Sequence, residues 1–193
     1  MGIFLLGSLA AYEGSVASRA RITPIVTADT TNKYMMSRSP HIATENLTSI
    51  KPVFGNFTTD GSGHDAGVGA ASAITASVEY PAGTFSQVLF SGSATGSIAD
   101  INILFADYTT VSIPSGATFW IRSFIHNTAG LFYNPWQNSF LGEAVALSAT
   151  VISDQTMGGT VTNSGSFSYP PVAILGMTRN ASVVVIPSIA TGG

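Results

Sequence analysis

The chain has 193 residues, a length that suits one domain burying roughly 70% of its unfolded surface. Only 9% of the residues are charged, against roughly 25% in ordinary soluble domains, and the net charge of -3 provides no basic face for a phosphate backbone. Nucleic acid is therefore not expected as a partner, and the absence of cysteine excludes disulfides, thiolate nucleophiles and sulfur-ligated metals. We predict no cofactor and no metal site. The hydroxyl-rich composition is typical of extracellular β proteins and repetitive assemblies.

Residues 1–20 are predicted to form an apolar N-terminal arm. A secretory signal has Lys or Arg before its apolar run, but no Lys or Arg precedes the apolar run 3–11. The run is also far too short to span a bilayer. We expect this run to dock either on its own domain or on a neighbouring subunit, with no membrane span.

The next part of the chain, residues 13–51, contains most of the positive charge. Strands are expected at 22–27 and 48–54, whereas the pattern between them has no period strong enough to predict an element. Residues 60–67 fit Gly-x-Gly-x-x-Ala formally and include two aspartates. No helix pattern follows, and the aspartate spacing does not fit the twelve-residue calcium loop, so we predict a flexible hairpin loop.

Five short apolar runs, separated by Gly and Pro, form the central part of the chain. They are residues 74–80, 85–90, 101–105, 111–113 and 117–125. In the first run, Ile74, Ala76 and Val78 alternate with polar residues, which predicts that Ser77 and Glu79 point toward water. The spacing predicts an all-β fold, an antiparallel, jelly-roll-like β-sandwich with at most one short helix.

The fifth run has the strongest alternation. One face of the predicted strand carries Phe119, Ile121 and Ile125, and the opposite face carries Trp120, Arg122 and Phe124. We predict that the first set is buried in the core.

An aromatic-rich loop follows at residues 130–136, with Phe132, Tyr133 and Trp136 as candidate binding residues. Aromatic rings supply large, rigid contact area, so this loop could stack on a glycan or contact a partner protein. The alternative is a lid folded back on the end of the sandwich. Beyond it, we predict one short helix at 139–147 and closing strands at 149–153, 160–162 and 172–175.

Residues 182–187 are predicted to form a C-terminal strand, because Ser182 precedes the apolar run Val-Val-Val-Ile and Pro187 follows it. Together with residues 76–85, 111–122 and 154–157, this end resembles the accessory N-terminal β-sandwich of SGNH (GDSL-type) hydrolase-like proteins of bacteria and phages. In that family an apolar strand leads into Gly-Asp-Ser-Ile, whose Ser is the nucleophile. The resemblance implies that Ser188 stands at an altered nucleophile position.

The departures from the family indicate a module without catalytic activity. Pro187 replaces the Gly-Asp of the family, and the sequence ends five residues after Ser188, before the family's oxyanion donors and Asp-x-x-His base. His41, His64 and His126 lie upstream, and we expect them at the surface or at interfaces rather than as a general base.

We therefore predict a non-catalytic structural or adhesive β-sandwich module. Its expected setting is a virion surface, as a coat-decorating or tail protein, or another extracellular assembly, and its expected partner is a second copy in a homo-oligomer or virion lattice. The alternative is a carbohydrate-binding accessory domain, or a truncated, degenerate relative of an SGNH-type carbohydrate esterase.

Overall fold

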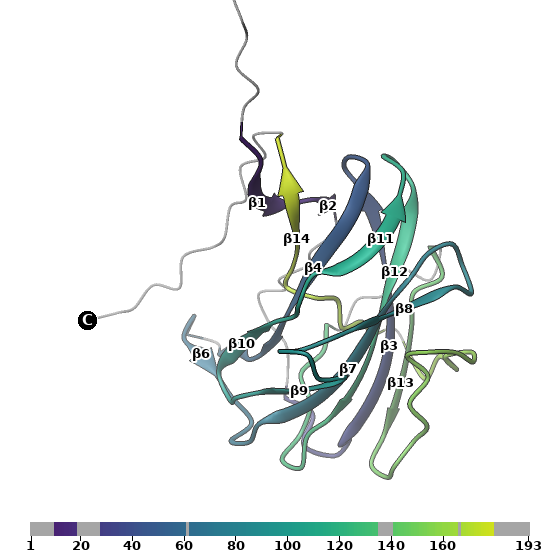
Figure 1. Cartoon of the computed structure of the whole chain (residues 1–193). Helices are drawn as coiled ribbons and strands as arrows, with labels where there is room; N and C mark the ends of the chain where they lie inside the picture. Colours follow the sequence, from purple (N-terminus) through teal and green to yellow (C-terminus); the bar gives the residue numbers. More distant parts are fainter. Residues whose placement is uncertain (1–9, 19–27, 61, 135–140, 166, 180–193) are drawn as a thin grey trace, which may run out of the picture.

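The computed structural model describes residues 10–18, 28–60, 62–134, 141–165 and 167–179 (Figure 1). These residues form antiparallel sheets and contain no α-helix, so the predicted all-β antiparallel sandwich is confirmed.

One sheet has five strands. Its hydrogen-bonded path is β1-β14-β4-β10, and β11 also pairs with β4. The long strand β4 confirms the strand predicted at 48–54, and β14 confirms the one predicted at 172–175. The members are β1 (Tyr12–Ser15), β14 (Ala173–Thr178), β4 (Leu47–Asn56), β10 (Asn102–Phe105) and β11 (Thr109–Ile113).

The other sheet has seven strands. Its path is β13-β3-β12-β7-β8, with β2 paired to β3 and β9 paired to β7. β5 (Thr58–Thr59) and β6 (Asp65–Ala66) form a separate short hairpin, so residues 65–66 of the loop predicted at 60–67 are a short strand. The members of the large sheet are β13 (Ala144–Ser148), β3 (Tyr34–Ala43), β12 (Thr118–His126), β7 (Ser72–Glu79), β8 (Phe85–Val88), β2 (Ala17–Ser18) and β9 (Thr95–Ile98).

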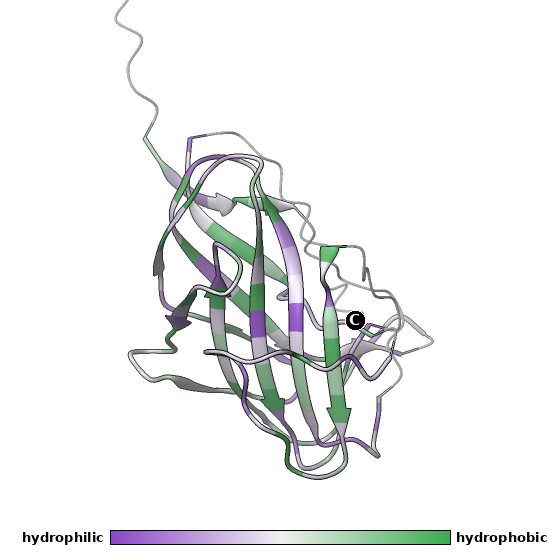
Figure 2. Cartoon of the chain, turned by 90° about the vertical axis from the view of Figure 1, so that its right-hand side faces the viewer, coloured by the Kyte–Doolittle hydropathy of each residue, from purple (hydrophilic) through white to green (hydrophobic). Residues whose placement is uncertain are grey.

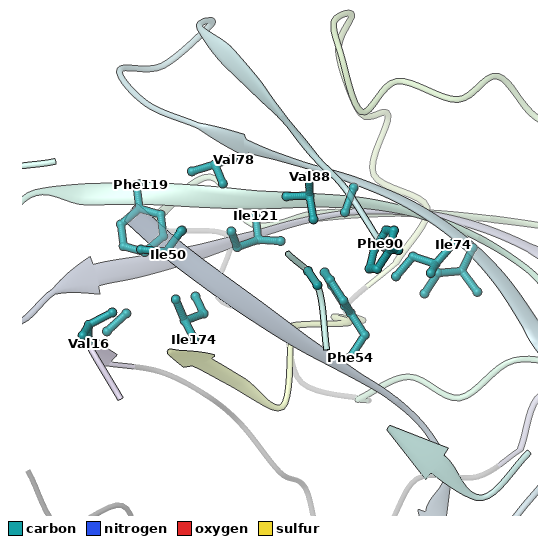
Figure 3. Close-up of a cluster of buried hydrophobic side chains, with 14 of the residues drawn as sticks. Val16, Ile50, Phe54, Ile74, Val78, Val88, Phe90, Phe119, Ile121 and Ile174 are labelled. Carbon is teal, nitrogen blue, oxygen red and sulfur yellow. The ribbon is translucent and has the colours of Figure 1, made fainter. Parts of the chain in front are cut away.

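The hydrophobic core lies between the two sheets (Figure 3). On β12, Phe119, Ile121 and Ile125 are at most 2% exposed, which confirms the predicted inward face of this strand. The five-stranded sheet contributes side chains such as Phe54 and Ile174 to the same cluster. Alternating side chains of both sheets thus build one apolar layer.

Backbone hydrogen bonds join the two sheets at two edges of the sandwich. At one edge the chain passes from β1 to β2 through the fully buried Val16, whose N–H donates to Ile174 O and whose carbonyl accepts from Thr44 N–H, both at 3.0 Å. At the other edge, Asp107 N–H donates to Leu89 O at 2.8 Å. Residues 12–15 and 17–18 of the predicted arm are therefore strands of the sandwich itself, and residues 1–9 and 19–20 lie outside the described ranges.

Several predicted elements differ from the structure. The helix predicted at 139–147 is wrong, since residues 144–148 form β13. The outer edge of that strand is occupied by hydrogen bonds from Val145 N–H to Asn163 Oδ1 (3.1 Å) and from Leu147 N–H to Ser164 Oγ (2.8 Å). Residues 149–153 and 160–162 are irregular rather than strands. The predicted strands at 22–27 and 182–187 lie outside the described residues.

The sequence pattern also failed to predict the strands β3 and β9. β3 carries Met35 and Met36, which are both buried, and its polar residues are too many for a clear period of two. β9 is a Thr-Gly-Ser-Ile segment that only tertiary pairing with β7 makes a strand.

Candidate functional surfaces

The described part of the aromatic loop contacts its own sandwich. Phe132 is 5% exposed, and Tyr133 is half-buried, with its hydroxyl donating to Asp29 Oδ2 at 2.9 Å and its ring 4.6 Å from that of Phe167. Burial, together with the hydrogen bond to Asp29 and its negative charge, raises the pKa of Tyr133 to about 12. Trp136 lies outside the described residues. With 5% of its surface exposed, Phe132 has little open ring surface for stacking on a ligand.

The three histidines occupy separate places in the structure. His41 is buried in β3, 3.0 Å from Ser39 Oγ, so the expectation of a surface or interfacial position is wrong for this residue. Its side chain points inward because it lies opposite Phe119 in the β3–β12 register. His64 is exposed in the hairpin loop, and His126 ends β12 with its ring stacked on another strand's tyrosine at 4.4 Å.

A buried ion cluster lies on the outer face of the seven-stranded sheet. Arg38 on β3 and Arg122 on β12 are direct cross-strand partners, a pairing of like charges that is unfavourable by itself. Glu79 on β7 lies between the two guanidinium groups. Its Oε2 accepts from Arg38 Nε and from Arg122 Nε, both at 2.8 Å, and its Oε1 accepts from Arg38 Nη2 at 3.0 Å. The carboxylate therefore bridges the two cations and offsets their mutual repulsion.

Two aromatic rings flank this cluster. The guanidinium carbon of Arg38 is 4.0 Å from the centroid of the Trp120 ring, and that of Arg122 is 4.6 Å from the Phe85 ring. Planar guanidinium groups stack well on such faces, which favours burial of the charges.

Residues 154–159, which we call the cover, lie over the cluster on its outer side. Arg122 Nη1 donates to Gln155 O and Gly159 O, both at 2.9 Å, and Ser77 Oγ donates to Thr156 O. Sequence alternation predicted Ser77 and Glu79 toward water, and this is wrong, since they are 0% and 2% exposed. The alternation was correct about which face they occupy, but a distant segment buries that face. Figure 2 shows hydrophilic residues in the middle of the long strands here.

The cluster shifts the ionisation of its carboxylate. Burial opposes ionisation of Glu79, but the hydrogen bonds from Arg38, Arg122 and Gly83 N–H outweigh it and lower the pKa from 4.5 to about 2. The group is charged at neutral pH and serves to hold β3, β12 and β7 together.

An open pocket of about 550 Å³ lies beside the cover. Asp154 is the carboxylate in its lining, and both of its oxygens accept hydrogen bonds, Oδ1 from Thr156 and Oδ2 from Thr75. These bonds fix the covering segment on β7. The complete lining is Thr75, Gln87, Ala94, Asp154, Thr156, Met157 and Gly158.

The outer face of the five-stranded sheet is apolar and open. Ile103 and Phe105 on β10 are 41% and 49% exposed, Met177 on β14 is 54% exposed, and Tyr108, between β10 and β11, is 42% exposed. Phe105 lies opposite Val53 on β4, and Val53 lies opposite Ala173 on β14. Met177 is four residues after Ala173 on the same strand, so Phe105 and Met177 lie on the same face of the sheet. We call Ile103, Phe105, Tyr108, Leu175 and Met177 the apolar face.

An ion pair lies within the apolar face. Lys51 Nζ on β4 is 3.1 Å from Glu13 Oε1 on β1, and it lies 5.3 Å from the Phe105 ring centroid and 5.5 Å from that of Tyr108. The Tyr108 hydroxyl lies 3.7 Å from Met177 Sδ, and its pKa is raised by burial and by the adjacent Glu13. The charges and the apolar side chains therefore form one continuous surface.

Within the described ranges, no three potential metal ligands among His, Asp and Glu come together. The described residues also contain no helix long and apolar enough to cross a membrane. A scan against protein-family models gives no match, and a search of curated proteins gives none either.

Proposed function

We propose that this chain is a structural or adhesive module that assembles with copies of itself through the apolar face. The single observation that carries the proposal is the exposure of four large apolar side chains on neighbouring elements of one sheet face. Contiguous apolar surface of this kind marks interaction sites in soluble proteins. Aromatic residues and methionine are also the types enriched in interface cores.

Composition supports an extracellular or virion setting for such an assembly. With 9% charged residues, the chain has few like charges to repel identical neighbours in a lattice. The resemblance to accessory sandwiches of SGNH-type proteins agrees with a non-catalytic role.

The proposal is tested by measuring the particle mass in solution across a range of concentrations. We expect an oligomer whose dissociation constant rises at least tenfold in Phe105→Ser, since an interfacial aromatic anchor contributes ~2 kcal/mol or more. Val151→Ser is the matched control, because Val151 is 74% exposed but follows β13 on the other sheet. A wild-type chain that stays monomeric at high concentration would contradict the proposal.

A further inference from the structure

We infer that the partner of the apolar face is the same face of a second copy, related by a two-fold axis that passes close to the Lys51–Glu13 ion pair. This inference rests on the proposed function and adds the symmetry and the residues that meet.

The charges of the apolar face are self-complementary. A two-fold contact brings identical patches together, so every residue must tolerate its symmetry mate or a near neighbour of it. The face carries one cation and one anion whose charged atoms are 3.1 Å apart. An axis that lies in the interface, near their midpoint and perpendicular to the line joining the two charged atoms, places each Lys51 beside the Glu13 of the other copy, so that four charges of alternating sign form a ring.

Both charged groups remain available for such a contact. The side chains of Lys51 and Glu13 are 23% and 39% exposed, so their mutual attraction is screened by water in the single chain. A second copy would exclude that water and supply an additional opposite charge to each group. Network formation of this kind is the setting in which ion pairs contribute to specific association.

The apolar residues around the pair supply the remaining contact. Phe105, Tyr108 and Met177 surround Lys51, and each exposes between 42% and 54% of its surface. Phe105 and Tyr108 expose close to half of aromatic side chains that span about 150–250 Å² each, and Ile103 and Met177 add further apolar area. Flanking polar atoms would extend this toward the roughly 800 Å² per partner of an ordinary stable interface.

A head-to-tail contact would need a second, complementary surface elsewhere on the chain. In the part of the chain described by the structure, the other large exposed apolar side chains come from separate segments. They are Tyr12 at the start of β1, Ile42 on β3, Leu89 after β8, Ile101 before β10, Val151 after β13 and Met157 in the cover. None of these provides neighbouring strands with a shared apolar face. The self-complementary arrangement is therefore favoured.

Charge exchange between two variants tests the inference. Lys51→Glu and Glu13→Lys alone should each weaken self-association by roughly tenfold or more, because like charges then meet across the axis. An equimolar mixture of the two, with one variant fluorescently labelled, should form mixed oligomers with an affinity near that of the wild type. The double variant Lys51→Glu/Glu13→Lys should also self-associate, because both its internal pair and the pairs across the axis are restored.

The mixture separates a contact across the axis from a local effect within one chain, since each variant keeps its internal repulsion after mixing. Restored association in the mixture, with each variant still folded on its own, supports the inference. If the single variants associate like the wild type, or if the mixture stays dissociated while Phe105→Ser still disrupts assembly, the two-fold arrangement is wrong and the proposed function stands. A monomeric wild type overturns both.

Discussion

The buried ion cluster gives the sharpest prediction about stability. Glu79→Gln keeps the size of the side chain but removes the charge that Arg38 and Arg122 share. The two guanidinium groups then remain opposite each other on adjacent strands, and Arg122 is held 6% exposed beneath the cover. Removing one partner of a buried ion pair leaves an uncompensated charge, which costs about 3–5 kcal/mol.

The pKa of Glu79 gives an independent value. A carboxyl whose pKa falls from 4.5 in the unfolded chain to about 2 in the fold stabilises the folded state by roughly 3 kcal/mol at neutral pH. Because the folded pKa is the lower one, this contribution is complete above pH 4.5 and is lost as the pH falls from there through about 2. The substitution and the titration thus predict losses of similar size.

Urea unfolding of the wild type and of Glu79→Gln at pH 7 and at pH 2 measures both quantities. We expect a difference in the free energy of unfolding of about 3 kcal/mol at pH 7 that shrinks below about 1 kcal/mol at pH 2. Glu45→Gln, in the turn between β3 and β4, is the matched control for loss of a carboxylate outside the cluster, and at pH 7 it should change the free energy of unfolding by less than about 0.5 kcal/mol. A difference under 1 kcal/mol at pH 7, or one that persists undiminished at pH 2, would refute the reasoning.

Four further predictions concern the core, the loop and the ends of the chain. Phe119→Ala should lower the free energy of unfolding by about 3–5 kcal/mol in a denaturant titration, and a loss below a third of that would mean that the side chain is not a core residue. If the aromatic loop binds glycans, a glycan array should give signals that Trp136→Ala loses while remaining folded; a silent array would leave the loop as a packing or protein contact. Short acyl esters should hydrolyse no faster with the wild type than with Ser188→Ala, and any Ser188-dependent turnover would disprove the non-catalytic role. Deleting residues 1–11 should leave a folded sandwich, since β1 begins at Tyr12, but this sandwich should form fewer or smaller oligomers in a measurement of particle mass. Unchanged assembly would exclude a role of these residues between subunits.

Sequence patterns predicted the fold class because strand alternation is a local property. On β12 and β7, apolar residues at every second position face one way for geometric reasons, whatever the rest of the chain does. Phe119, Ile121 and Ile74 could therefore be assigned to the core directly, and the structure buries all three.

The candidate surfaces depended on contacts between distant parts of the chain. Glu79 and Ser77 look like solvent-facing residues of a half-buried strand, and only the cover, nearly eighty residues later, buries them. The pairing of Lys51 with Glu13, and the position of Lys51 beside Phe105, follow from the order β1-β14-β4-β10. Local sequence determined which face of its own strand each residue occupies. Only the tertiary structure decided what lies on that face, because burial and charge pairing are set by which strands become neighbours.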